Sequence, residues 1–385
     1  MKILHICLAQ FYIDDFSYQE NVLPRIHQLQ GHSVAILAST ETYIGTKLGY
    51  VKPAAYQTKE GIAVTRIPYV SWLPHAVAKK LRIYKGVMKV IERFDPEIIF
   101  IHDCQFISIK EIARYANRHK DLKIYVDGHT DFINSGKSWV SKNVLHKMIY
   151  RWCAQKINPF TRKFYGVLPI RVDFYKDVYG IKEDKIELLP LGADLTKVDF
   201  DKAAIIRQNI RRDLNIGQKD FVIISGGKLD KRKNIHLLME AVSELSYGDC
   251  NLIIFGKPDE EMKNEIEKLA QLPRIKYVGW IKSEKAYDYL LASDLAVFPG
   301  THSVLWEQAV GVGLPCIFKK WNGIQHIDLH GNCLFLEKDS KEEIKEKVCL
   351  LYENRELLLD MRKVAQKEGI PMFSYYEIAK RAIEL

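Results

Sequence analysis

The segment PGTHSVLWEQAVGVGLPC (299–316) combines a turn, one histidine and a short apolar helix with a single charged side chain, Glu307. At the predicted helix start, backbone N–H groups lack intrahelical partners and can bind a phosphate or a sugar hydroxyl. These N–H groups belong to Thr301, His302, Ser303 and Val304. The His302 ring can donate to the same oxygens, and the Glu307 carboxylate can accept from hydroxyls. The alternatives are a surface-loop histidine and a solvent-exposed glutamate.

Two lysines follow the glycine turn that ends at Gly227. Lys228 and Lys233 lie between the strand-like run FVIISGG (221–227) and the helical pattern NIHLLMEAVSEL. Two cations at a strand end, beside a helix N-terminus, neutralise a pyrophosphate and stabilise it as a leaving group. We expect both lysine side chains to be solvated in the free protein. The alternative is that KLDKRKN is only a solvated charged loop.

Alternating strands and helices must position these groups. The first 40 residues predict strand, helix and strand at KILHICLA, YQENVLPRIHQLQ and SVAILAS, and further strands follow at 97–102 and 123–129. A second series of apolar strands begins near residue 220, at 221–227, 251–257, 275–280, 294–300 and 315–320. This alternation predicts an α/β fold with two doubly wound, Rossmann-like domains in tandem, joined near 188–203. Since ligands bind at the carboxyl ends of such strands, we expect a cleft between facing domains.

Composition excludes several classes of protein. The 385 residues are 47% apolar and 27% charged, as in ordinary globular proteins. No apolar run approaches the roughly 18 residues of a membrane span, so we expect a cytoplasmic protein. Seven scattered cysteines without a Cys-x-x-Cys pair argue for a reducing compartment and against a structural zinc or disulfide framework.

The positive charge is confined to the first half of the chain. Residues 1–200 hold 29 lysines and arginines against 20 acidic residues, whereas residues 201–385 hold 28 of each. The basic residues gather at 75–94 and 136–156, mixed with apolar side chains. They form either ordinary solvated helix faces or a surface that contacts anionic lipid or a phosphate-bearing substrate. No nucleic-acid-binding module accompanies them, so we expect no nucleic-acid partner.

The segment SGGKLDKRKNIHLLMEA (225–241) resembles the start of the donor domain in retaining GT-B glycosyltransferases of the family-4 kind. The resemblance implies that Lys228 and Lys233 contact the diphosphate of a nucleotide sugar. QGHSVAILAS (30–39) and PLGAD (190–194) are similar to two further elements of the family. In IKYVGWIKSEKAYDYLLASDLAVFPG, Trp280 and Ile281 take the places that flank the nucleobase, with Trp280 as a packing residue rather than a stacking partner.

The resemblance also implies the domain boundaries. Residues 1–190 would form the acceptor domain and 191–370 the nucleotide-sugar domain. Residues 371–385, which include FSYYEIAKRAIEL, would form a last helix that crosses back onto the first domain.

The chain departs from the family at the loop before the last donor-domain helix. The family usually carries two glutamates seven residues apart there, of which the second holds the ribose hydroxyls. Aligning Gly313 and Pro315 with the family's Gly-x-Pro puts Gln308 at the second glutamate, and a one-residue slip puts Glu307 there. In either register the first glutamate is absent, and the segment GTHS is expected to replace it.

The first domain should hold the acceptor. The segment VDGHTD (126–131) resembles the family's histidine-bearing loop, so His129 is the preferred catalytic residue and His102 the alternative, although either could be structural. Asp131 lies in the same loop. The acidic loop after the first strand would repel phosphate and is assigned to sugar or acceptor hydroxyls through Asp15, Gln19 and Glu20.

The family mechanism implies transfer with retention, by front-face attack, on a hexose carried by a nucleotide diphosphate. No cofactor is expected, and no metal, because two lysines supply the charge; the pair Asp199 and Asp201 is interpreted as a helix start. The acceptor would be a glycan or lipid-linked sugar in cell-surface polysaccharide synthesis, reached by peripheral contact with the inner face of the membrane. A sugar-nucleotide epimerase and a non-catalytic binding protein are the rivals. A dehydrogenase is disfavoured because no Gly-x-Gly-x-x-Gly opens either domain.

Overall fold

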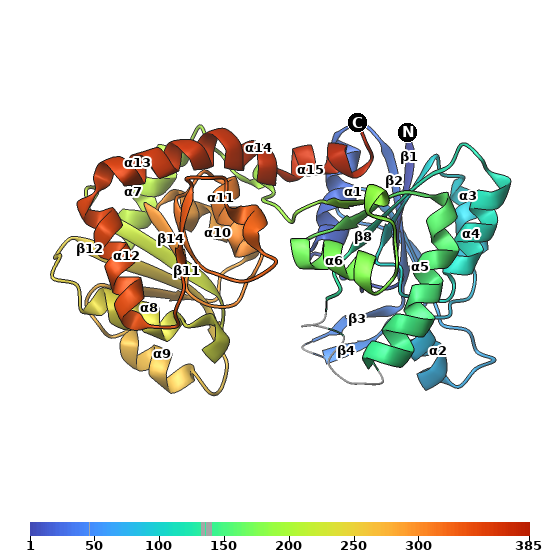
Figure 1. Ribbon diagram of the computed structural model, residues 1–385, viewed down its shortest axis with the longest axis horizontal. Coiled ribbons are helices and arrows are strands. Elements are labelled where there is room, and N and C mark those ends of the chain that lie inside the picture. Colours follow the sequence, from blue (N-terminus) through green and yellow to red (C-terminus); the bar gives the residue numbers. More distant parts are fainter. Residues whose placement is uncertain (46, 132–134, 136–140) are drawn as a thin grey trace. The chain divides into compact units, whose positions relative to one another are not determined.

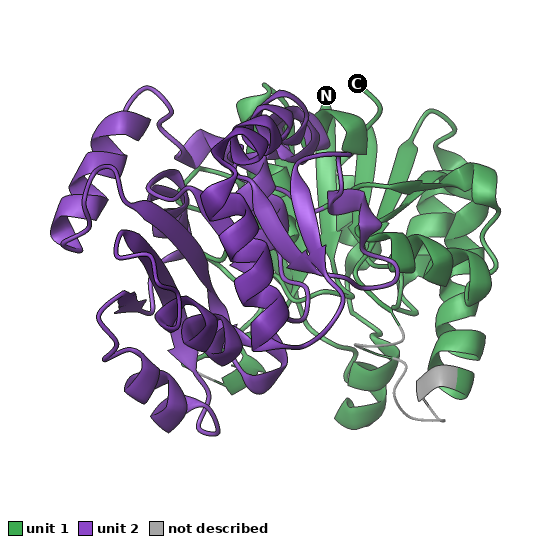
Figure 2. Ribbon diagram, turned by 60° about the vertical axis from the view of Figure 1, so that its left-hand side comes forward, with its two compact units in different colours: residues 1–190, 379–385 green, residues 191–378 purple. Residues whose placement is uncertain are grey.

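The computed structural model describes residues 1–45, 47–131, 135 and 141–385. The start of the basic segment 136–156 therefore lies outside the described residues. The chain forms two compact units (Figure 2). Unit 1 contains Met1–Pro190 and Ala379–Leu385, and unit 2 contains Leu191–Ile378.

Unit 1 is built on an eight-stranded sheet with the order β10-β9-β8-β7-β1-β2-β6-β5 (Figure 1). All neighbouring strands are parallel except β5, which pairs antiparallel with β6. The central strands are apolar and buried on both faces, as a parallel sheet covered by helices requires. The strands are β1 (Lys2–Cys7), β2 (Ser33–Ser39), β5 (Ala54–Gln57), β6 (Ala63–Ile67), β7 (Ile98–His102), β8 (Lys123–Gly128), β9 (Thr161–Gly166) and β10 (Ile186–Leu188).

Helices cover this sheet, and α3, α4 and α5 lie together on one side of it (Figure 1). The helices are α1 (Gln19–Leu29), α2 (His75–Leu81), α3 (Val87–Phe94), α4 (Ile109–Arg118), a π-helix (Ser141–Tyr150), α5 (Arg151–Ile157) and α6 (Pro169–Asp177). A separate two-stranded hairpin of β3 (Glu41–Ile44) and β4 (Lys47–Tyr50) leaves most of its side chains exposed.

Unit 2 repeats the plan with a six-stranded parallel sheet, ordered β13-β12-β11-β14-β15-β16. Its strands are β11 (Phe221–Leu229), β12 (Cys250–Pro258), β13 (Ile275–Gly279), β14 (Leu295–Phe298), β15 (Cys316–Lys319) and β16 (Cys333–Leu336). Its helices are α7 (Ala203–Asp213), α8 (Ile235–Ser243), α9 (Lys263–Leu269), α10 (Ser283–Leu291), α11 (Leu305–Gly311), α12 (Lys341–Glu353), α13 (Arg355–Val364) and α14 (Ile370–Phe373). The predicted α/β class with two Rossmann-like halves is confirmed.

The last helix, α15 (Tyr375–Ala382), begins in unit 2, and its final residues belong to unit 1. There the hydroxyls of Tyr125 and Tyr165 donate to the carbonyls of Ile383 and Arg381, at 3.3 and 3.0 Å. Among the described residues, no helix combines the length and the apolar character that crossing a membrane demands.

Candidate functional site

In unit 2, β11 ends at a glycine turn that places Lys228 at the carboxyl edge of the sheet. Gly227 has φ +108°, a left-handed conformation that side chains rarely adopt. The Lys228 side chain is 63% exposed and lies 3.4 Å from a carboxylate oxygen of Asp230. Lys228 therefore remains solvated, as expected from the sequence, at the edge where open α/β sheets bind ligands.

The expectation that Lys233 is solvated is wrong. Its Nζ donates to the carbonyl oxygens of Thr301 and His302, at 2.6 and 2.9 Å, and burial lowers its pKa to about 8. The loop comes this close because Gly300 has no side chain: a Cβ there would lie 2.5 Å from the Lys233 Cα. An ammonium group has three donors, so two are used to hold the loop and one remains for a ligand.

The backbone N–H groups of the GTHS loop are partly used. The N–H of Thr301 donates to the carbonyl of Arg232 at 3.0 Å, so Thr301 is not an open donor, contrary to the prediction. Within the described part of the chain, we find no hydrogen bond from the N–H groups of His302, Ser303 and Val304. The anion-binding role predicted for this loop is therefore reduced to these three donors.

Glu307 is fully buried inside unit 2, between two histidines. Its Oε1 accepts hydrogen bonds from Nε2 of His302 at 2.8 Å and from Nε2 of His326 at 2.9 Å. Burial alone would raise the pKa of Glu307, but the two histidines hold it at about 2. The carboxylate is thus a structural anion that a ribose cannot reach in this conformation, which corrects the prediction that it meets the ribose. The position of His326 in the sequence gives no signal that it contacts Glu307.

Gln308 and the nucleobase residues stay more accessible. No polar partner of the Gln308 amide is found among the described residues, and its polar atoms are not among the fully enclosed ones. Trp280 is 70% exposed just after β13, so it does not pack as predicted, and Ile281 beside it is half-buried. Of the two candidates for the ribose, the structure therefore leaves Gln308 with free hydrogen-bonding capacity.

In unit 1, the partly buried His129 lies at one end of a line of buried polar side chains, which hydrogen bonds join from Asp127 onward. His129 Nε2 lies 3.4 Å from Oδ2 of Asp127, and the same oxygen lies 2.8 Å from Nδ1 of His102. His102 Nε2 then meets His5 Nδ1 at 3.1 Å, and His5 Nε2 meets His27 Nδ1 at 3.0 Å. The line ends where His27 Nε2 lies 2.8 Å from the carbonyl oxygen of Ala379. His5 and His27 were not singled out from the sequence, because one histidine on each of two distant elements has no recognisable spacing.

The carbonyl at one end fixes the direction of these hydrogen bonds. A carbonyl only accepts, so His27 carries its hydrogen on Nε2 and a neutral His27 must accept from His5. A neutral His5 must likewise accept from His102, whose remaining nitrogen faces the Asp127 carboxylate at 2.8 Å. A further proton must therefore lie between His102 and Asp127. Burial lowers the pKa of His27 to about 4 and that of His5 below its usual range, which keeps the far end neutral.

The charge on His129 follows from the same carboxylate. Burial would lower the pKa of His129, but Asp127 raises it to about 9. Burial would raise the pKa of Asp127, but His102 and His129 hold it well below its usual range. His102, the alternative catalytic residue, is fully buried and cannot touch a substrate, so its role is structural.

Ligand atoms of His102, Asp127 and His129 all lie within 4.8 Å of one another, a grouping that could hold a metal ion. Both imidazoles point at the same carboxylate oxygen, however, and one of them at hydrogen-bond distance. A metal ion would have to displace the proton between His102 and Asp127, and this arrangement therefore favours a proton over an ion.

The other predicted acceptor residues already have partners or are buried. Asp15 pairs with Lys59 at 2.8 Å, and Asp131 pairs with Arg171 at 3.1 Å. Gln19 and Glu20, in the first turn of α1, are 2% and 6% exposed. Both amide atoms of Gln19 are buried without a hydrogen-bond partner among the described residues.

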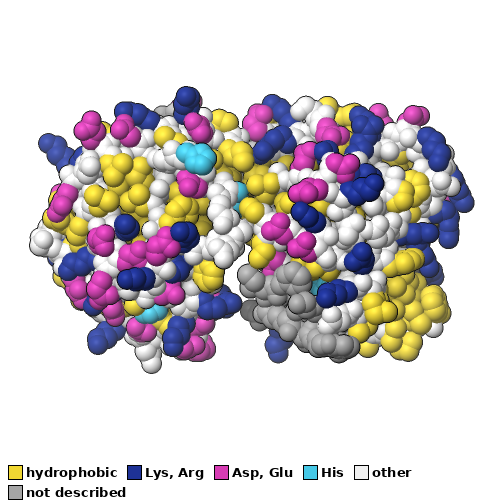
Figure 3. Space-filling model, viewed as in Figure 1, with side chains coloured by type: hydrophobic (Ala, Val, Ile, Leu, Met, Phe, Trp, Pro, Cys, Tyr) yellow, Lys and Arg dark blue, Asp and Glu magenta, His cyan; other side chains and the backbone are white. Residues whose placement is uncertain are grey.

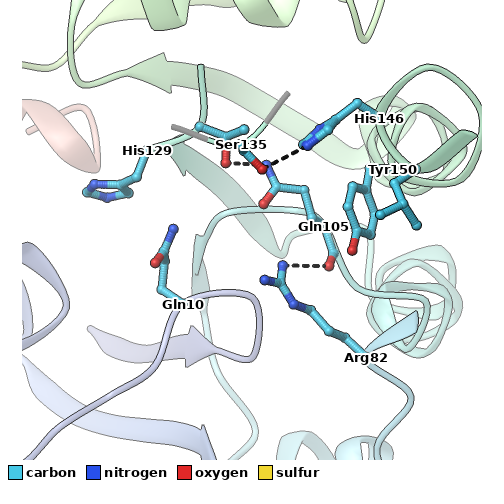
Figure 4. A pocket seen from close by; sticks show the side chains of 9 residues that line it. Gln10, Arg82, Gln105, His129, Ser135, His146 and Tyr150 are labelled. Atoms are coloured by element: carbon cyan, nitrogen blue, oxygen red, sulfur yellow. Dashed lines mark hydrogen bonds between the residues drawn. The ribbon is translucent and has the colours of Figure 1, made fainter. Parts of the chain in front are cut away.

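His129 also lines a pocket of about 260 Å³ in unit 1 (Figure 4). The pocket lies at the carboxyl ends of β1, β7 and β8, where Gln10, Gln105 and Thr130 reach into it. Gln105 is held by Oγ1 of Thr130 at 2.9 Å, and Asp103 beneath it receives bonds from Gln10 and Gln105. On the far side are His146 and Tyr150 of the π-helix and Arg82. Most of these residues lack a sequence motif and were not predicted.

Residues 206–368 match the family model described as Glycosyl transferases group 1. Over 261 residues, the chain is 21% identical to mannosylfructose-phosphate synthase of Agrobacterium fabrum, covering 63% of this chain and 55% of that protein. It is 28% identical over 135 residues to the lipopolysaccharide core biosynthesis glycosyltransferase LpsD of Rhizobium meliloti, covering 34% of this chain and 39% of LpsD. The chain thus spans about half the length, or less, of these relatives.

The structure of Anabaena HepE in complex with UDP superposes with a TM-score of 0.69 at 14% identity, covering 100% of this chain and 99% of that one. This likeness shows the GT-B fold.

Proposed function

We propose that this protein, whose residues 206–368 match the Glycosyl transferases group 1 model, transfers a hexose from a nucleotide-diphosphate sugar to a glycan or lipid-linked acceptor. The observation that carries the proposal is the pair Lys228 and Lys233 at the end of β11, within the segment that matches the family. Each keeps donor capacity for a diphosphate. HepE, which shares the fold, binds UDP, and the name of LpsD assigns that relative to lipopolysaccharide core synthesis.

In the proposed reaction the bond between the anomeric carbon and the diphosphate oxygen breaks, and its electron pair leaves with the diphosphate. The acceptor hydroxyl attacks the same face of the sugar, and its proton passes to an oxygen of the leaving diphosphate, so the configuration is retained. Lys228, Lys233 and the N–H groups of the GTHS loop stabilise the charge that develops there. We propose that no metal is needed, because these groups supply the positive charge.

The proposal is tested by incubating the protein with UDP-, GDP- and ADP-hexoses and measuring release of nucleoside diphosphate, with and without a glycan acceptor and with EDTA. We expect release that depends on the acceptor, persists in EDTA and gives a product with the donor's anomeric configuration. Interconversion of the sugar without release would instead indicate an epimerase. Binding without either reaction would indicate a binding protein.

Gln308, rather than Glu307, is proposed to hold the ribose. Replacing Gln308 by alanine should weaken UDP binding about tenfold, because the hydrogen bond to the ribose is lost. The free energy of unfolding should change by less than about 1 kcal/mol, because the amide has no polar partner among the described residues of the free protein. Replacing Glu307 by glutamine should do the opposite: it should lower stability by about 2–3 kcal/mol, because two hydrogen bonds lose their charge, and leave UDP affinity near that of the wild type. Calorimetric titration with UDP and thermal unfolding measure both effects. Equal loss of affinity in the two variants would contradict the assignment.

We also propose that unit 1 contacts an anionic membrane through a surface formed by the β3–β4 hairpin and the region around α2. Its exposed side chains include Ile44 (57%), Trp72 (73%) and Val77 (42%), and hydrophobic side chains gather over α2 (Figure 3). Lys79 joins the two elements by pairing with Glu41 at 2.7 Å. Apolar side chains beside exposed lysines, such as Lys47, suit a headgroup boundary.

In flotation with vesicles that contain phosphatidylglycerol, the wild type should bind at low salt and be released at high salt. Replacing both Ile44 and Trp72 by serine should reduce binding at least about tenfold, because two large apolar side chains no longer leave water. Leu359→Ser, at a similarly exposed position (56%) of unit 2, is the matched control and should bind like the wild type. Binding that changes neither with salt nor with the Ile44 and Trp72 substitutions would show that this surface does not contact the membrane.

A further inference from the structure

Arg82 occupies a backbone position that is better suited to glycine. It ends α2 in the left-handed region, with φ 51° and ψ 60°. Helices often end in this conformation, but usually with glycine, because a Cβ atom crowds the following carbonyl. A long side chain is therefore held at this position on a strained backbone conformation. Strained residues of this kind gather at ligand sites.

The Arg82 guanidinium has no counter-charge among the residues that the structure describes. Its Nη1 donates to the carbonyl oxygen of Gln105 at 3.0 Å, and its Cζ lies 5.8 Å from the centre of the Tyr150 ring. In the part of the chain that the structure describes, no carboxylate lies within ion-pair distance of Arg82. Three carboxylates beside the pocket-lining residues already have partners: Asp103 is held by Gln10 and Gln105, Asp127 by His102 and His129, and Asp131 by Arg171.

The described lining of the pocket offers donors and positive charge but no carboxylate. Besides Arg82, His129 carries a positive charge at neutral pH, because its pKa is about 9. Tyr150 Oη donates to the carbonyl of Lys80 at 3.0 Å, and the His146 ring is hydrogen-bonded to Ser135 and Tyr179. These bonds hold the side chains of Tyr150 and His146 in place at the edge of the pocket. Figure 4 shows Arg82 and His129 on opposite sides of Gln10 and Gln105.

We propose that this pocket binds an anionic group of the acceptor, a phosphate or a carboxylate, and that Arg82 is the residue that recognises it. The inference rests on the proposed transferase function and names the chemistry of its acceptor. A guanidinium with unused donors binds such oxyanions through paired hydrogen bonds. The volume of about 260 Å³ leaves room for the anion together with part of the group that carries it.

Inorganic phosphate and glucuronate are the probes for the two oxyanions. Each is titrated into the full-length protein in saturating UDP, while the Nε resonances of the arginine side chains are followed by NMR. We expect the Arg82 resonance to shift in the wild type, and calorimetry to show at least tenfold weaker binding in Arg82→Gln. The matched control is Arg114→Gln, which removes an exposed arginine of α4 and should bind like the wild type. Glucose, which is uncharged, should give the same result with the wild type and with each variant.

A second variant separates binding from folding. Glycine fits the left-handed backbone, so Arg82→Gly should keep or raise the thermal midpoint of unfolding. The same variant should lose its affinity for phosphate and glucuronate. If the Arg82 variants lose only phosphate binding, the acceptor carries a phosphate. If they lose only glucuronate binding, the acceptor carries a uronate. Wild-type protein that binds neither probe, or variants that bind both as tightly as the wild type, overturn the proposal. UDP affinity is measured on the same samples: absent UDP binding contradicts the proposed transferase, whereas an Arg82-dependent probe site would stand without it.

Discussion

Replacing Lys228 by alanine should weaken UDP binding about 10- to 100-fold and leave the thermal midpoint within about 2 °C of the wild type. A hydrogen bond between a charged donor and a phosphate contributes about 1.5–3 kcal/mol, which corresponds to that range. The side chain is 63% exposed, and its one ion pair in the described structure is with Asp230, which also pairs with Arg232 at 2.8 Å, so little stability depends on Lys228. Calorimetric titration with UDP and differential scanning calorimetry measure the two effects.

Lys233→Ala should differ by lowering both affinity and stability. Its amine donates to two loop carbonyls, of Thr301 and His302, and their loss should cost about 2–3 kcal/mol. Lys231→Ala removes a neighbouring lysine that is 73% exposed and should match the wild type in both measurements. Full UDP affinity in Lys228→Ala would contradict the diphosphate assignment, and an unchanged midpoint in Lys233→Ala would contradict the anchoring role.

The fold could be predicted from the sequence because its central strands are mostly apolar runs. KILHIC, IIFIH and LAVF are buried on both faces, so each stands out from its flanks. Strands β6 and β9 escaped prediction, since AVTRI contains Arg66 and TRKFYG begins with polar residues. Arg66 is nevertheless buried, because the carbonyls of Ser39 and Tyr12 and the Asp14 carboxylate accept its hydrogen bonds. A strand that depends on such remote partners has no local apolar signature.

The same distinction separates the predicted site residues from the missed ones. Lys228 could be found because the glycine turn and the charged loop are contiguous in sequence. The burial of Glu307 depends on His326, nineteen residues away, and the charge of His129 depends on Asp127. Arg82 enters its pocket only because α2 ends beside the loop after β7. Side-chain types and local spacing therefore predict which chemistry is available, whereas tertiary contacts decide which groups are charged and reachable.

Replacing Asp127 by asparagine should return the pKa of His129 from about 9 to below 7. The amide has nearly the shape of the carboxylate, and its NH₂ can donate to Nδ1 of a neutral His102. The hydrogen-bonded line to His5 and His27 then stays intact without its extra proton. What the variant removes is the negative charge that favours a protonated His129. NMR titration of the imidazole resonances measures this pKa directly.

The pH dependence of the stability of unit 1 should also change in Asp127→Asn. The pKa shifts of His129 and Asp127 determine the direction of this change. The pKa of His129 is raised on folding, so its stabilisation is complete below about pH 6.5 and is lost as the pH rises through about 9. The pKa of Asp127 is depressed, so its contribution is present above about pH 4 and is lost as the pH falls further. For His129 the shift corresponds to at most about 3 kcal/mol. Wild-type unit 1 should therefore weaken on both sides of this range, and Asp127→Asn should weaken less steeply on either side.

Amide hydrogen exchange in β7 and β8 reports the opening of unit 1 alone, which global unfolding of a two-unit chain does not. Opening free energies at pH 6 and pH 9.5 should differ by about 2–3 kcal/mol in the wild type and by less than about 1 kcal/mol in Asp127→Asn. Asp131→Asn is the matched control: it removes a neighbouring buried carboxylate that pairs with Arg171, and it should leave the pKa of His129 near 9. An ordinary pKa for His129 in the wild type, or one that survives in Asp127→Asn, would mean that the carboxylate does not set its charge.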